Sequence, residues 1–196
     1  LANEVQRVSY HPYAQVPEKG YAQKVTEWRA LLARYSPALQ LWQGECGCPS
    51  SEGGVGALSN LSWNEVRQAK WLLRRTLLDL SLGLELVSYF HLVDLVRYRW
   101  KQKPQETPRD AAPRTNFRAD FGLLRGDDYT PKPSYFACQR LCSLFDRATQ
   151  PIDVHARLAG DKITVPADSL TQICFLRGKH PLFAYWWPEA LQKDVA

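Results

Sequence analysis

One carboxylate, Glu45, stands where a side chain could do chemistry. It closes the apolar segment LWQG (residues 41–44), and a turn containing glycine and proline follows it. A carboxylate at the end of a buried strand is partly removed from water and could attack a carbon as a nucleophile. Strand alternation puts Leu41, Gln43 and Glu45 on the same side, so Glu45 would share the direction of Leu41. A glutamate on an ordinary turn after a strand is the alternative, and the spacing alone favours neither.

Two further strand ends carry polar or aromatic groups. The segment 4–10 (EVQRVSY) is followed by His11 and Tyr13, and the segment 84–92 (LELVSYFHL) includes Phe90 and runs on to Asp94. The carboxyl ends of parallel strands in an α/β barrel meet at one face, where reactive groups gather. Tyr13 favours a functional role there, whereas His11 could equally be a strand-end histidine bonded to the backbone.

Helical patterns separate these strands. Apolar residues at helical spacing predict a helix over about 22–35, which Pro37 stops. Ser62 and Glu65 form the pattern of a capping box for the next helix, and Gly83 ends it. Its buried face is predicted to comprise Val66, Ala69, Leu73, Leu77 and Leu80. A third helix is predicted from Pro133 to about Asp146.

Strand and helix alternate up to residue 150, which predicts an α/β fold with a parallel sheet. Three such units cannot close by themselves, because a (β/α)8 barrel needs about 250 residues. Residues 151–196 instead predict short strands, at 154–158, 162–165, 172–177 and 182–187, the last two forming a hairpin. We therefore expect two parts, an α/β part at 1–150 and a β-rich tail at 151–196.

Positive charge is concentrated in one stretch. Residues 97–118 hold seven basic and two acidic residues, which equals the net charge of +5 for the whole chain. Three prolines in this stretch predict a solvated loop rather than a packed element. Nucleic-acid binding is the alternative for these bases. It is disfavoured because they follow no helical face and few aromatic residues stand between them.

Cysteines and hydropathy exclude further classes. Five cysteines cannot all pair within one chain, and their spacings, 46 with 48 and 138 with 142, fit no zinc site. The sequence therefore suggests no metal and no cofactor. No run of 18 apolar residues occurs, so no membrane span is expected. The chain begins with Leu1 and contains no methionine, so we expect it to be a piece of a longer protein.

Several short strings, in this order and spacing, resemble strands six to eight of the retaining glycoside hydrolases of clan A. The strings are SYHPY (9–13), LWQGECG (41–47), SYF (88–90) with Asp94, FGLL (121–124) and PKPSYFA (131–137). The resemblance covers about residues 5–147. It implies a partial (β/α)8 TIM barrel, comprising about strands 6–8 and their helices, followed by the start of a β-sandwich.

The resemblance also implies roles for single residues. Glu45 would be the nucleophile of a retaining glycosidase, and Tyr13, or else His11, would hydrogen-bond that carboxylate or the sugar. Gln43 and Phe90 would contact substrate, Phe90 in a place where the clan often has a tryptophan. Asp94 is expected to tie down the following loop rather than to act in chemistry.

The second carboxylate of such a site is expected to be missing. In the clan the acid/base follows an asparagine at the end of strand four, and this sequence has two Asn-Glu pairs. Glu4 precedes its strand and Glu65 lies in a first helical turn, so neither can face Glu45. The chain would therefore lack the N-terminal barrel half and be inactive alone.

Two hypotheses about function follow from the resemblance. The first is a retaining hydrolase of glycosides or oligo- or polysaccharides, and the alternative is a non-catalytic carbohydrate-binding relative. The compartment is unknown, although enzymes of this resemblance are commonly exported, which slightly favours an extracellular or periplasmic place. The sugar, its linkage and the oligomeric state do not follow from the sequence.

Overall fold

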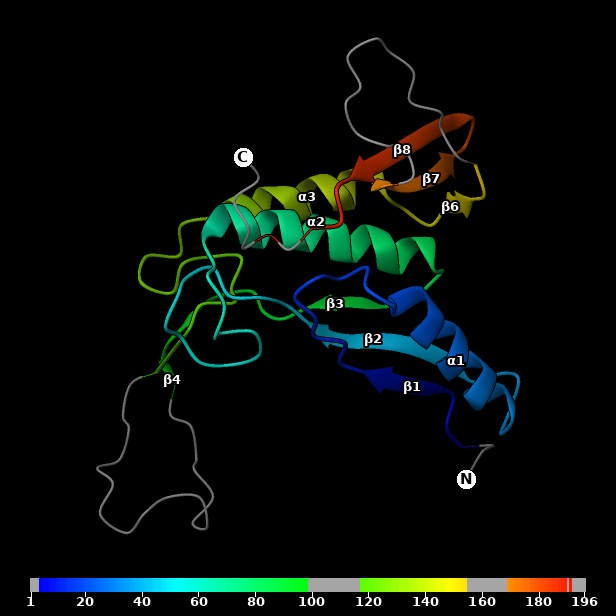
Figure 1. Cartoon of the computed structure of the whole chain (residues 1–196), viewed down its shortest axis with the longest axis horizontal. Coiled ribbons are helices and arrows are strands. Elements are labelled where there is room, and N and C mark those ends of the chain that lie inside the picture. Colours follow the sequence, from blue (N-terminus) through cyan, green and yellow to red (C-terminus); the bar gives the residue numbers. More distant parts are fainter. Residues whose placement is uncertain (1–3, 99–116, 155–168, 190, 192–196) are drawn as a thin grey trace.

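The computed structural model describes residues 4–98, 117–154, 169–189 and 191 (Figure 1). These residues form a mixed α/β fold. Its helices are α1 (Tyr21–Ala33), α2 (Glu65–Ser81) and α3 (Pro133–Leu144). Its strands are β1 (Arg7–Tyr10), β2 (Gln40–Cys46), β3 (Val87–Tyr89), β4 (Leu95–Tyr98), β5 (Phe117–Ala119), β6 (Thr149–Ile152), β7 (Thr171–Arg177) and β8 (His180–Trp186).

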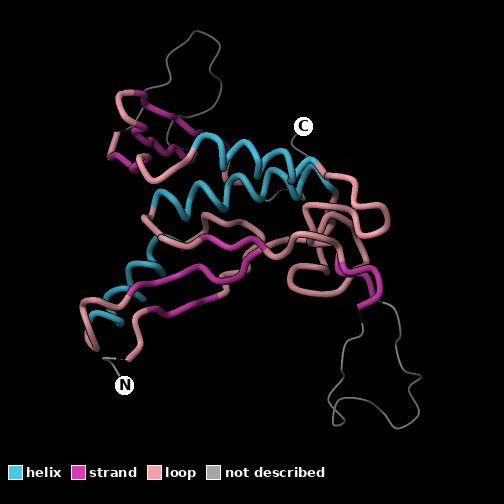
Figure 2. The backbone as a smooth tube through the Cα atoms, turned by 180° about the vertical axis from the view of Figure 1, so that it is seen from behind, coloured by secondary structure: helices cyan, strands magenta, loops and turns pink. Residues whose placement is uncertain are grey.

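Strands β1, β2 and β3 form a parallel sheet in that order, as the strand–helix alternation predicts. Its helix-facing side is apolar, because Leu41 of β2 packs with Tyr21 and Val25 of α1 and with Leu78 of α2. Helix α2 lies between the sheet and α3, which Figures 1 and 2 show from opposite sides. The three carboxyl ends therefore point the same way, which brings the expected site residues to one edge.

The start of α2 differs from the predicted capping box. Asn64 is the N-cap, and its side-chain oxygen accepts a hydrogen bond of 2.9 Å from the backbone N–H of Arg67. The Ser62 hydroxyl instead donates to Glu52, and Glu65 forms an ion pair with Arg125 at 2.6 Å. Glu65 therefore has a partner 60 residues away, and Ser62 is engaged by Glu52, 10 residues before it.

The buried face of α2 also differs from the prediction. Val66, which we expected in the core, is exposed. Trp71, Leu72 and Leu78 are buried instead, together with an ion pair between Arg75 and Asp79 at 2.6 Å. Apolar periodicity does not predict this face, because Arg75 and Asp79 are charged and the pattern assigns charged residues to the solvent side.

The basic stretch lies mostly outside the described residues, so its expected loop character stays a prediction. Its two ends pair as the antiparallel strands β4 and β5, which sequence patterning did not predict. Beyond them, α3 begins at Pro133, as expected from proline at a first helical turn.

The tail forms an antiparallel sheet in the order β6-β7-β8. The predicted hairpin of β7 and β8 is confirmed, with Arg177 opposite His180. The predicted strand at 162–165 and most of that at 154–158 lie outside the described residues, and β6 spans the position where we expected a domain boundary.

One ionic cluster fastens the tail to the α/β part. Arg74 of α2 makes two hydrogen bonds, of 2.6 and 2.7 Å, to the Glu18 carboxylate in the loop before α1. Glu18 also accepts a hydrogen bond from the Trp186 indole at the end of β8, and Arg74 donates to the Glu189 carbonyl at 2.8 Å. Because Arg74 and Glu18 are nearly buried, this cluster holds the tail against α2.

Candidate active site at the carboxyl ends of the parallel strands

Glu45 lies at the carboxyl end of β2, the middle strand of the parallel sheet. The pairing of β2 with β3 shifts between Gln43 and Cys46, so β2 has a bulge there. Cys46 packs against Trp71 on the helix side, the same side as Leu41. Strict alternation cannot put residues 41 and 46 on one side, so the bulge changes the direction of the residues within it.

The prediction that Leu41 and Glu45 point to the same side of the sheet is therefore wrong. Leu41 faces the helices rather than a barrel interior, and the bulge turns Glu45 away from that side. The Glu45 side chain remains 33% exposed although its strand is central. The expectation that Glu45 opens to the strand-end edge holds, but for a different geometric reason.

Two side chains that follow β1 contact the Glu45 carboxylate. The Tyr13 hydroxyl donates a hydrogen bond of 2.6 Å to Oε1 of Glu45. The Nδ1 atom of His11 lies 3.8 Å from Oε2. The three residues that the sequence singled out thus meet in space, from segments 32 residues apart.

Burial is the main cause that raises the pKa of Tyr13 far above its ordinary value of 10.0, and the adjacent Glu45 carboxylate raises it further. A phenol with a raised pKa keeps its proton at neutral pH. Tyr13 is therefore a neutral hydrogen-bond donor to Glu45, and it fixes one carboxylate oxygen without forming an ion pair with it.

Glycine at position 44 allows β1 to approach closely. A Cβ atom at Gly44 would lie 1.8 Å from the Ser9 hydroxyl oxygen, far inside van der Waals contact, and 3.7 Å from Nε2 of His11. This close approach brings the end of β1, and with it His11, beside Glu45. A glycine inside an apolar strand is the sequence signal that indicates such an approach.

Gln43 does not lie where a substrate-contacting residue would. Its side chain is fully buried, and its carbonyl oxygen accepts a hydrogen bond of 2.6 Å from the backbone N–H of Ser88. Gln43 thus links β2 to β3 across the bulge, where the regular ladder is interrupted. This correction follows from burial, which the sequence pattern did not reveal.

Aromatic rings lie beside the end of β3. Phe90 is partly exposed, and its ring centroid lies 6.1 Å from that of Phe121. Burial lowers the pKa of His91, whose ring is 4.4 Å from Phe90. Phe121, which belongs to the FGLL string of the resemblance, is almost fully buried here.

Asp94 supports the loops as expected. Its Oδ1 atom accepts from the backbone N–H of Gly122 at 2.7 Å and from the Lys132 ammonium at 2.6 Å. Lys132 also donates to the hydroxyl of Ser50, in the loop after β2. This buried cluster joins three loops at the strand-end edge, and Lys132 was not predicted as a site-supporting residue.

The remaining candidates lie elsewhere. Glu65 is paired with Arg125 at the start of α2, and Glu4 precedes β1, at the opposite end of the sheet from Glu45. Among the residues described, no group of three or more histidine, cysteine or acidic side chains could hold a metal ion. No helix in the described ranges is both long and apolar enough to cross a bilayer.

The edge can thus present a carboxylate that is partly exposed, fixed by a neutral donor and flanked by an imidazole. The sequence matches no family model and no curated protein. Among solved structures, the fold is similar to part of the fold of glycoside hydrolases. The likeness is to fold alone, since sequence identity is low.

The most informative of these structures is a GH2 beta-galacturonidase from Eisenbergiella tayi bound to galacturonate. It is 18% identical, with a TM-score of 0.50, and the match covers 72% of this chain and 24% of that one. A beta-D-glucuronidase from Dictyoglomus thermophilum matches at 15% identity and a TM-score of 0.47, covering 72% of this chain and 23% of the enzyme. The chain thus spans about a quarter of the length of either enzyme.

Proposed function

We propose that this chain carries the nucleophile side of the active site of a retaining glycoside hydrolase. Its strands β1, β2 and β3 would be the sixth to eighth strands of a (β/α)8 barrel of clan A. The observation that supports this most strongly is the Glu45 carboxylate at the end of the middle parallel strand, held by Tyr13 at 2.6 Å. Barrel enzymes place their reacting groups at this end of their strands.

The proposed chemistry is a double displacement. An oxygen of Glu45 attacks the anomeric carbon, a glycosyl–enzyme ester forms, and the bond to the leaving-group oxygen breaks as an acid protonates that oxygen. The conjugate base of that acid then takes a proton from a water molecule. The water attacks the same carbon, and the ester bond to Glu45 breaks. Tyr13 donates a hydrogen bond to Oε1 of Glu45. The other oxygen, Oε2, lies 3.8 Å from the exposed His11 ring, and we propose it as the attacking atom.

The acid/base would come from outside this chain. A retaining pair needs its two carboxyl groups about 5–5.5 Å apart. In the described ranges, the side chains that contact the Glu45 carboxylate are Tyr13 and His11. Since Glu4 and Glu65 are displaced from the edge, we place the acid/base on an earlier strand of the complete protein.

The parallel sheet supports the proposal of a missing barrel half. It has two outer edges, on β1 and β3, and its side away from the helices carries Trp42, over which the Arg7 guanidinium lies at 4.7 Å. Open strand edges and a partly exposed aromatic ring call for further strands. We propose that residues 1–150 complete a barrel with that half and that residues 151–196 begin a β-sandwich.

The substrate would be a carbohydrate. Phe90, partly exposed at the end of β3, would form a smaller platform for a sugar ring than a tryptophan would. Among the similar structures are enzymes named for acidic sugars, and those names describe the enzymes themselves. The proposal for this chain names no particular sugar.

The direct test is the Glu45→Gln substitution in the complete protein, assayed on a panel of aryl glycosides. Loss of the nucleophile should lower kcat/KM by about three orders of magnitude or more. Glu52→Gln, which changes a carboxylate in the loop after β2, is the matched control and should retain activity. Equal activity of the Glu45 variant and the control would refute the proposal.

A second candidate is a non-catalytic carbohydrate-binding relative. The lack of a second carboxylate among the described contacts of Glu45 favours it. It predicts that the complete protein binds a glycan but turns over no glycoside, so the same assay panel combined with calorimetry separates the two candidates.

A further inference from the structure

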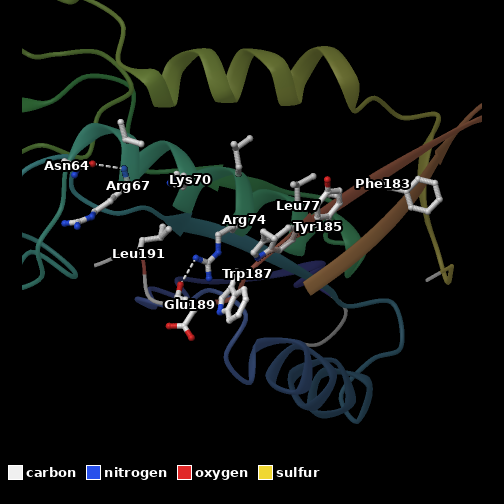
Figure 3. Close-up of a pocket in the computed structure, with 14 residues that line it drawn as sticks. Asn64, Arg67, Lys70, Arg74, Leu77, Phe183, Tyr185, Trp187, Glu189 and Leu191 are labelled. Atoms are coloured by element: carbon white, nitrogen blue, oxygen red, sulfur yellow. Dashed lines mark hydrogen bonds between the residues drawn. The ribbon is translucent and has the colours of Figure 1, made fainter. Parts of the chain in front are cut away.

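A groove of about 830 Å³ runs between α2 and the strand β8 with the residues that follow it (Figure 3). Its apolar floor includes Leu73 and Leu77 of α2. None of its lining residues belongs to the Glu45 site, which lies at the carboxyl end of the parallel sheet. A groove of this size matches those that take small organic ligands.

Aromatic side chains of β8 and the residue after it line this groove. Phe183 and Tyr185 stand opposite Cys174 and Gln172 of β7, so they share one face of the sheet. They are 50% and 63% exposed, and Trp187 after the strand end is 42% exposed. Alternate residues of a strand lie about 7 Å apart. Phe183 and Tyr185 at this spacing, with Trp187 just after the strand, offer successive flat surfaces to an extended ligand.

Positive charge lies at the other end of the groove. Lys70 and Arg67 line it near the start of α2, away from Phe183 (Figure 3). The Arg67 guanidinium also donates hydrogen bonds to the backbone carbonyl and the hydroxyl of Ser62. Arg74 is neutralised by Glu18, so it adds little to this charge. Glu189 is the acidic residue of the lining, and its carbonyl is held by Arg74. The groove therefore combines aromatic surface at one end with basic side chains at the other.

We propose that this groove is a second carbohydrate-binding site that takes a linear oligosaccharide with acidic sugars. Sugar rings pack on Tyr185 and Trp187, and a sugar carboxylate lies toward Lys70 and Arg67. The choice of a carbohydrate rests on the proposed glycoside hydrolase function. The choice of an acidic one rests on the charge of the lining.

The site would act apart from catalysis. Since Glu45, Tyr13 and His11 are not among the residues that line the groove, a polymer bound here would be held to the protein while another part of it enters the strand-end site. Binding at two places raises the effective concentration of the second segment. Turnover of a long acidic polymer would then depend on the groove, whereas turnover of a short aryl glycoside would not.

The test is calorimetric titration of the complete protein with a galacturonic acid tetramer and with a neutral glucose tetramer. To keep catalysis from consuming the probe, both titrations use the Glu45→Gln background. We expect the acidic tetramer to bind more tightly. Trp187→Ala should weaken its binding roughly three- to tenfold, through the loss of one aromatic contact. Lys70→Gln should weaken the acidic probe selectively.

Matched controls are Tyr35→Ala and Lys24→Gln, an exposed ring and an exposed lysine at α1, away from the groove. The proposal is overturned if neither tetramer binds, if both bind equally, or if the groove and control variants bind alike. Stronger binding of an extended peptide, added along the free edge of β8, would also overturn it.

The outcome is separable from that of the proposed function. If the acidic tetramer binds in the groove but the unmodified protein cleaves no glycoside, the hydrolase proposal fails and the groove stands. If glycosides are cleaved through Glu45 while Trp187→Ala leaves polymer turnover and tetramer affinity unchanged, the groove fails and the hydrolase stands.

Discussion

At the scale of single residues, the environment of Glu45 suits a nucleophile. Its 2.6 Å partner, Tyr13, is neutral, and no lysine or arginine is among its described contacts. A bound guanidinium would hold the negative charge and oppose attack on carbon, whereas a phenol fixes the carboxylate orientation while leaving it charged. The position of Tyr13 therefore bears directly on the rate.

Removing the Tyr13 hydroxyl should show this. Tyr13→Phe takes away a hydrogen bond to a charged group while retaining the ring, so we expect kcat/KM of the complete protein to fall roughly ten- to hundredfold. Tyr35→Phe, at an exposed tyrosine distant from the site, is the control. Steady-state kinetics on one aryl glycoside suffice, and an unchanged kcat/KM would remove Tyr13 from the site.

A second residue prediction concerns pH. Burial lowers the pKa of His91 from its ordinary 6.5, so the unfolded chain takes up a proton at this position more readily than the folded chain. The free energy of unfolding should therefore decline as pH falls from about 7 through 6.5 toward the lower folded pKa. His91→Phe should reduce this decline, as measured by urea denaturation at pH 7 and pH 5. The prediction fails if wild type and variant lose the same stability.

At the scale of elements, the alternation of strands and helices follows from apolar runs, and the parallel sheet follows with it. The bulge at 43–46 does not follow from the apolar run, because an inserted residue depends on pairing with β3, and Gly44 is its local signal. The start of α2 was mispredicted because Ser62 bonds with Glu52 in the preceding loop and Glu65 pairs with Arg125, which is 60 residues away.

Some residues of the candidate site could be predicted from the strand pattern, and others could not. Glu45, His11 and Tyr13 each follow a predicted strand, and parallel pairing brings them together. The buried position of Gln43 and the supporting role of Lys132 depend on how loops pack, which periodicity does not encode.

The fastening of the tail gives an element-scale prediction. Arg74→Gln removes one partner of the nearly buried pair with Glu18 and leaves that carboxylate without its counter-charge. We expect a loss of about 3 kcal/mol in the free energy of unfolding. The exposed pair of Arg177 with Asp146 is the control, and Arg177→Gln should cost less than about 1 kcal/mol. Equal losses in urea denaturation would contradict the role assigned to Arg74.

At the scale of the whole molecule, the proposed barrel half has open edges. Residues 1–196 expressed alone should self-associate and hydrolyse no glycoside, because two strand edges and one sheet face are uncovered. Co-expression with the upstream part of the same gene should yield a soluble, active complex. Light scattering and an activity assay check both statements. A monodisperse, active 196-residue chain would refute the missing barrel half.

The central claim is that Glu45 forms a covalent bond to the sugar. The most direct measurement is to trap that intermediate in the complete protein with an activated 2-deoxy-2-fluoro glycoside and to sequence the labelled peptide by mass spectrometry. We predict one added glycosyl group, carried by Glu45 and absent from the Glu45→Gln variant. A label on another carboxylate, or turnover with no labelled peptide and inversion at the anomeric carbon, would contradict the account.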